Sequence, residues 1–182
     1  MESSSWSKEL GCLLMRKPDA QAVLYGSPNY PQIRGFVNFY EANNCVVLAA
    51  SVVGLPYGPA PCGTRVFGFH IHEGRSCTGN ATDPFADAGS HYNPGNCEHP
   101  HHAGDLPPLF GNNGYALMTV LTNRFTIAQV MGRAVIVHGS WCTNLPMISR
   151  HSLREIPEKE SPAASSAGGS TAHTPKLCCA EN

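Results

Sequence analysis

The sequence predicts an all-β domain, an antiparallel sandwich or barrel that carries one long functional loop. Val, Leu, Ile, Phe and Tyr recur at every second position through several short segments, as in half-buried strands. The counts of 18 Gly and 15 Pro in 182 residues favour a turn-rich domain over a helical bundle. No stretch of convincing length has helix periodicity, and the sequence contains no internal repeat.

Length and composition narrow the class of protein further. The chain is long enough for one domain with a substantial core. A net charge of −1 argues against a nucleic-acid binder, which would show a basic excess. No apolar run approaches the ~20 residues that a membrane span needs. Nine His and eight Cys are unusual counts, and together they point towards a bound metal.

The expected strands alternate with segments of good turn chemistry. In order, they are 21–27, 33–42, 45–55 and 64–73, then 115–122 and 133–138. SPNYPQ separates the first two and EANN the second and third, and both are rich in turn residues. Residues 74–113 show no periodicity. A compact domain seldom contains so long a loop unless the loop has a function.

The two ends of the chain differ from this pattern. Residues 1–19 are expected to be a mobile leader, residues 20–139 the domain, and residues 140–182 a disordered tail rich in Ser, Ala, Pro and Glu. The leader lacks the charged start, apolar stretch and cleavage site of a secretory signal. This favours the cytosol, although eight cysteines leave the compartment open.

A constellation of histidines is the main sign of chemistry. His70 and His72 alternate in one strand, so their side chains point to the same face. Alone, such a pair is equally well explained as a solvated strand face. The long loop and the last strand add His91, His99, His101, His102, Asp105 and His138. Solvation explains this density poorly. Imidazole ligands suit zinc and copper, and a mixed His/Asp set suits four-coordinate zinc.

Three motifs carry a resemblance to a known family. GFHIHEG, HYNPGNCEHPHHAGDL and the Gly-Arg-x-Val-Ile-Val-His of 132–138 resemble the copper/zinc superoxide dismutases, particularly the bacterial forms. The resemblance runs from about Ala20 to His138. It implies an eight-stranded Greek-key β-barrel, often dimeric. It also implies copper and zinc as cofactors, and superoxide as a substrate that is disproportionated to oxygen and hydrogen peroxide.

The resemblance also implies a role for each matching position. His70, His72 and His138 fall on the copper-only ligands, and His91 falls on the histidine that bridges copper and zinc and releases and retakes copper during turnover. The remaining zinc ligands fall on His99, His102 and Asp105. His101 has no ligand role unless it exchanges with His102, and Asp83 is read as a turn residue rather than an outer-shell group. Cys77 falls on a disulfide cysteine whose partner is unknown.

The C-terminal part departs from the family pattern. The final strand of the family carries an arginine and the second disulfide cysteine in a motif like GNSG-x-(Lys/Arg)-IACG, which is missing after His138. Arg150 and Arg154 stand in a different context. The final strand is therefore expected to be missing or disrupted, which leaves substrate guidance and the disulfide without their usual residues.

A shifted reading frame explains this departure. In the frame two bases onward, each codon takes the last base of one residue and the first two bases of the next. From Cys142 to Ser166 that frame can spell HQPSDDFTSQPSGNSGKRIACGVI, which contains the missing motif. We therefore hypothesise a frameshift, by mutation or sequencing error, between His138 and Cys142. The alternative is a genuine divergent tail.

The sequence leaves three interpretations of function. The first is a copper/zinc superoxide dismutase, and the second is a metal-binding relative, a copper or zinc buffer, with little or no turnover. The third is the product of a damaged gene, which would yield little soluble protein. The sequence leaves open whether the protein forms a homodimer. Four further cysteines have no assigned role, and a free buried thiol is the default for Cys45; they are Cys12, Cys45, Cys62 and Cys97.

Overall fold

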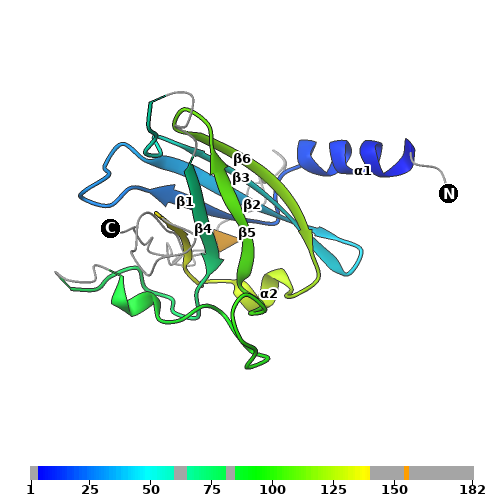
Figure 1. The fold of residues 1–182 in the computed structure, drawn as a ribbon. Coiled ribbons are helices and arrows are strands. Elements are labelled where there is room, and N and C mark those ends of the chain that lie inside the picture. The colour runs from blue at the N-terminus through cyan, green and yellow to red at the C-terminus, as the bar shows by residue number, and fades with distance from the viewer. Residues whose placement is uncertain (1–3, 60–64, 81–84, 140–153, 156–182) are drawn as a thin grey trace, which may run out of the picture.

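Two antiparallel sheets form the body of the described part of the protein (Figure 1). The computed structural model describes residues 4–59, 65–80, 85–139 and 154–155. One sheet has the strand order β6-β3-β2-β1-β8 and the other the order β5-β4-β7. The elements are α1 (Ser4–Met15), β1 (Ala20–Tyr25), β2 (Arg34–Ala42), β3 (Cys45–Val53), β4 (Arg65–Ile71), η1 (Ala86–Ala88), β5 (Asp105–Gly111), β6 (Tyr115–Thr122), α2 (Ile127–Val130), β7 (Val135–His138) and β8 (Arg154–Glu155). The all-β prediction is confirmed.

The alternating sequence pattern creates the core between the two sheets. Phe39 and Leu48 from the larger sheet and Phe67, Phe69 and Val137 from the smaller one are fully buried in the same cluster. Burying each such side chain contributes about 1.5–3 kcal/mol. This core fixes the positions of β4 and β7, the two strands that carry His70 and His138 near their C-terminal ends.

The hairpin between β2 and β3 follows from its turn sequence. Ala42 pairs with Cys45, so Asn43 and Asn44 form the turn, with φ values of 44° and 66°. Asparagine tolerates this left-handed conformation better than most residues, and two such residues suit the tight turn of a hairpin.

Strand β5 lies inside the segment that the sequence analysis read as one long loop, so that expectation was wrong. Pro107 and Pro108 hid the strand, because proline cannot donate a hydrogen bond within a sheet. The sheet order explains why they are tolerated: β5 is an edge strand.

Two helices also contradict the expectation of a chain without helices. Helix α1 occupies 12 residues of the segment read as a leader, and it projects away from the sheets (Figure 1). Helix α2 has only four residues and begins with a capping box between Thr126 and Gln129. Among the described residues, no helix is long and apolar enough to cross a membrane.

The closing strand is represented only by β8, whose two residues pair with Ala20 and Gln21 of β1. The described strands therefore do not close into a barrel. The rest of the tail lies outside the described residues, as do Asp83 and Cys62. The mobility of the leader and the disorder of the tail stay predictions.

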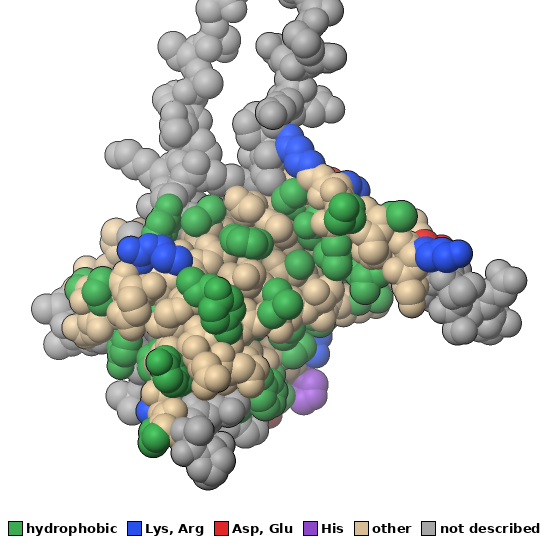
Figure 2. Space-filling view, turned by 90° about the horizontal axis from the view of Figure 1, so that it is seen from above, with side chains coloured by type: hydrophobic (Ala, Val, Ile, Leu, Met, Phe, Trp, Pro, Cys, Tyr) green, Lys and Arg blue, Asp and Glu red, His purple; other side chains and the backbone are tan. Residues whose placement is uncertain are grey.

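The outer face of the larger sheet is apolar over β6. Tyr115, Leu117 and Leu121 alternate along this strand and are 63%, 82% and 49% exposed, whereas Ala116 on the other face is buried. Hydrophobic side chains are visible over much of the face shown in Figure 2. Strand β6 thus carries apolar side chains on both faces.

Candidate metal centre

The end of β4 supplies the first two histidines. His70 lies in the strand and His72 just beyond it, where its backbone N–H donates to Ala134 O at 2.8 Å. His72 Nδ1 lies 2.9 Å from Gly89 O and donates to it, which leaves His72 Nε2 as the lone-pair nitrogen. Their ring centroids are 6.4 Å apart, so both rings enter one cluster.

His138 enters the same cluster from the end of β7. Its Nε2 lies 3.2 Å from His72 Nε2, and its ring centroid lies 4.9 Å from that of His70. Gly68 of β4 pairs with His138 in register. A Cβ at residue 68 would lie 3.2 Å from His70 Cε1 and 3.3 Å from His138 Cβ. A glycine there leaves room for both imidazoles.

Backbone hydrogen bonds to β4 hold the loop that carries His91. Tyr92 N–H donates to Ile71 O at 2.8 Å, and Ile71 N–H donates to Gly104 O at 2.9 Å. A Cβ at residue 104 would lie 2.2 Å from Ile71 O, so this close approach requires glycine. As a result, the His91 ring stacks on His70 with centroids 3.9 Å apart.

Four imidazoles form the first cluster, which we call the histidine group. One nitrogen of each ring lies within 4.8 Å of the corresponding nitrogen of every other ring; the members are His70, His72, His91 and His138. His70 Nδ1 is buried and has no hydrogen-bond partner among the described residues. An orphaned buried nitrogen costs about 1–3 kcal/mol, which a metal ion bound at that atom would remove.

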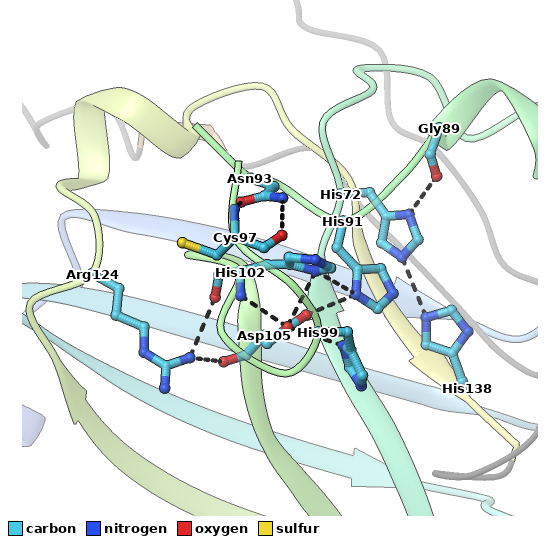
Figure 3. A network of polar contacts seen from close by, with 10 residues as sticks. All are labelled: His72, Gly89, His91, Asn93, Cys97, His99, His102, Asp105, Arg124 and His138. Atoms are coloured by element: carbon cyan, nitrogen blue, oxygen red, sulfur yellow. Dashed lines mark hydrogen bonds and ion pairs between the residues drawn. The ribbon is translucent and has the colours of Figure 1, made fainter. Parts of the chain in front are cut away.

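Three imidazoles and one carboxylate form the second cluster, which we call the mixed group. Its members also offer ligand atoms within 4.8 Å of one another; they are His91, His99, His102 and Asp105. The Asp105 carboxylate lies 2.7 Å from His91 Nδ1, 3.0 Å from His99 Nδ1 and 3.2 Å from His102 Nδ1. Asp105 begins β5 and pairs with His70 in register, so the two clusters are adjacent (Figure 3).

Burial disfavours the charged form of three members of the histidine group, which are His70, His91 and His138. Burial lowers the pKa of His70 far below its usual range, and the neighbouring imidazoles lower it further. The pKa of His138 falls to about 3, mainly because of burial. Burial also lowers the pKa of His91, although Asp105 opposes that shift. Neutral imidazole is the form that binds a metal.

The donor sets fit the two metals that the sequence suggested. An all-imidazole set suits copper, and three imidazoles with one carboxylate suit four-coordinate zinc. His91 belongs to both clusters: its Nδ1 faces Asp105 and its ring stacks on His70. His91 is thus the one residue that the two clusters share among the described residues.

The structure brings together the seven residues expected from the sequence to be ligands; they are His70, His72, His91, His99, His102, Asp105 and His138. His101 is exposed and belongs to neither cluster. Cys77 is buried beside Phe85 and Ile136 as a free thiol, and the expected disulfide is not formed among the described cysteines. Sequence reasoning missed Arg124, Gly89 and Gly104, whose contacts with the site involve main-chain atoms and leave no ligand-like spacing.

Comparison with known proteins gives consistent matches. A family model described as copper/zinc superoxide dismutase matches residues 33–141. A Cu-Zn superoxide dismutase of Photobacterium leiognathi is 37% identical over 86 residues. This match covers 39% of this chain and 48% of the Photobacterium protein. An extracellular Cu-Zn superoxide dismutase of Rattus norvegicus is 32% identical over 114 residues. This match covers 61% of this chain and 45% of the rat protein.

A third relative, a Cu-Zn superoxide dismutase of Brucella suis, is 37% identical over 83 residues. This match covers 39% of this chain and 48% of the Brucella protein. The chain thus spans about half the length of the curated relatives it matches. The matched residues include every member of both clusters.

Proposed function

Because the chain belongs to the copper/zinc superoxide dismutase family, we propose that it disproportionates superoxide, with copper at the histidine group and zinc at the mixed group. In this reaction one superoxide is oxidised to O2. A second superoxide takes that electron and two protons and becomes H2O2. Superoxide is the proposed substrate, and the reaction class is that of an oxidoreductase.

The orphaned nitrogen of His70 is the observation that carries the proposal. It is buried within a cluster of four imidazoles, and burial lowers the pKa of His70, His91 and His138. A neutral imidazole with an unused lone pair is ready to bind a metal without first losing a proton. A purely structural histidine at this depth would hydrogen-bond through that atom.

Three residues of the histidine group, His72, His91 and His138, have separate tasks in this proposal. Copper, when bound, supplies the one-electron chemistry because it cycles between Cu(II) and Cu(I) with imidazole ligands. His72 is oriented by Gly89 O, and His138 is held at the end of a buried strand. His91 is the residue suited to proton transfer: Asp105 engages its Nδ1, which leaves Nε2 to take up or release a proton.

The mixed group has a structural task in the proposal. Zinc does not change oxidation state, but its ligands would tie residues 99–105 to His91. The Asp105 carboxylate, only 4% exposed, would supply the one negative charge of that donor set. Fixing His91 from this side would orient its other nitrogen towards the histidine group.

A second candidate function is metal binding with little or no turnover, as in a copper or zinc buffer. The sequence after His138 favours it, because the family motif that contains an arginine beside the copper is missing there. Without a guiding cation, capture of an anionic substrate would be slower. A homodimer, also expected from the resemblance, stays a prediction.

Reconstitution with stoichiometric copper and zinc tests the proposal. We expect superoxide-dependent turnover in the wild type and its loss in H70N, which removes one imidazole from the histidine group. The matched control is H101N, an exposed loop histidine outside both clusters, which should retain activity. Copper or zinc bound tightly without turnover would favour the buffer, and failure to bind either metal would refute both functions.

A further inference from the structure

We propose that Arg124 is a positioning residue for the zinc site, an inference that rests on the proposed function. Its Nη1 donates to Asp105 O at 2.8 Å and to His102 O at 3.3 Å (Figure 3). Both acceptors are main-chain carbonyls of residues in the mixed group. One guanidinium therefore holds two of the four proposed zinc ligands through their backbone.

The backbone of Arg124 belongs to a segment that is anchored in the core. Residue 124 lies between β6 and α2, and its backbone N–H donates to Thr122 Oγ1 at 3.2 Å. The next residue, Phe125, is 3% exposed, and Ile127 is also buried in the main core cluster. Because its backbone is anchored on one side of the site, the arginine can restrain the loop on the other.

The part of the loop that carries His99 and His101 lies at the surface. His99 has 52% of its side chain exposed, and His101 is exposed as well. The turn from His102 to Asp105 is closed by Asp105 N–H donating to His102 O at 3.1 Å and by His102 N–H donating to Asp105 Oδ2 at 3.1 Å. Arg124 donates to the carbonyls of the same two residues, so it adds a further restraint to this turn from outside the loop.

The choice of backbone acceptors separates this role from an ordinary ion pair. An arginine bound to the Asp105 carboxylate would compete with zinc for the same oxygens. Instead, both carboxylate oxygens face the imidazoles, and the guanidinium approaches from the main-chain side. The positive charge lies near the donor set without occupying it, and the ligand side chains stay available.

A metal titration distinguishes this role from general support of the fold. The metal-free full-length chain is titrated with Co(II), which reports zinc sites by its visible spectrum, then with Zn(II) against a competing chelator, and separately with Cu(II). For R124A we expect zinc and cobalt affinity to fall about 10–100-fold, with copper affinity changed less than about threefold. R124K should recover most of the zinc affinity, because an ammonium can also donate to both carbonyls.

The matched control is R34A. Arg34 Nη1 also donates to main-chain carbonyls, those of Ile33 at 2.6 Å and of Pro31, but none belongs to either cluster. Its removal should leave both metal affinities unchanged. If R124A does not fold, R124Q is measured in its place, since it removes the charge and shortens the reach.

Each outcome has a separate meaning. Wild-type zinc affinity in R124A, or equal losses in R124A and R34A, would overturn the role of Arg124 and leave the proposed function standing. A wild-type chain that binds neither zinc nor cobalt would overturn both. Loss of zinc affinity confined to R124A, with recovery in R124K, supports the inference.

Discussion

Acid should destabilise the metal-free protein between pH 7.5 and 5.5, a range in which carboxylates titrate little. The pKa values of His70 and His138 are lowered in the folded state, chiefly by burial, and that of His138 falls to about 3. An unfolded chain binds protons at both residues near pH 6.5. Protons therefore favour the unfolded state as the pH falls below about 6.5. The contribution of these two histidines to the free energy of unfolding is fully present above that pH and is lost progressively towards about pH 3.

The size of the effect follows from the number of buried imidazoles. At one pH unit below 6.5, each histidine that stays neutral in the folded state lowers the free energy of unfolding by about 1.4 kcal/mol. The reason is that this histidine is protonated only in the unfolded state. Between pH 7.5 and 5.5, His70 and His138 together lower the free energy of unfolding by about 3 kcal/mol. The lowered pKa of His91 adds to this loss. Asp19, whose pKa is also lowered, titrates below 3.8 and does not contribute in this range.

Urea unfolding of the metal-free chain, followed by circular dichroism at the two pH values, measures this loss. In H138Q, which cannot be protonated at that position, the pH-dependent loss should be smaller by about 1.4 kcal/mol. Equal stability at both pH values, or greater stability at pH 5.5, would contradict the burial of neutral imidazoles. The metal-loaded protein should resist acid better, because protons compete with the bound ions for the ligand nitrogens.

Three further predictions concern the site, the surface and the reading frame. D105N should weaken zinc binding by about 100-fold or more, since a four-ligand zinc site is worth about 10–16 kcal/mol and one charged ligand is lost; unchanged affinity in a chelator competition, with H101N as control, would remove Asp105 from the site. L117K should change stability by less than about 0.5 kcal/mol because Leu117 is 82% exposed, whereas F39A in the core should cost about 3–5 kcal/mol; thermal unfolding that ranks them otherwise would contradict the burial. Resequencing the gene across codons 138–166 should reveal an insertion or deletion, or GNSGKRIACG in the shifted frame; bases that spell neither would refute the frameshift.

The strands of this fold could be predicted where side-chain alternation is the rule. Strands β2, β3 and β6 alternate because one face of each packs on the core, and the sequence shows that period directly. Strand β5 could not be found in this way, because Pro107 and Pro108 interrupt the pattern at a sheet edge. The four-residue helix α2 is too short to show a helical period.

The proposed ligands were predicted far better than the residues that position them. Histidine spacing within a strand and within a Pro-bounded loop is visible in the sequence, and so are the family motifs. Arg124, Gly89 and Gly104 act through a hydrogen bond to a carbonyl, a carbonyl itself and the absence of a Cβ. Such roles depend on which backbone atoms meet in space, and no spacing of residue types encodes that.

The position of the suspected frameshift separates metal binding from completion of the fold. Every member of both clusters lies at or before His138, and β4, β5 and β7, which carry His70, Asp105 and His138, contribute side chains to the main core. The family match ends at residue 141, which agrees with a break just after His138. In the described part, β1 pairs with β8 at Ala20 and Gln21, and the family motif of the closing strand is missing from the sequence after His138. Exposed edges promote aggregation. A chain with this tail should therefore bind both metals yet aggregate more readily than one ending in the family motif, and that combination distinguishes a broken reading frame from a lost metal site.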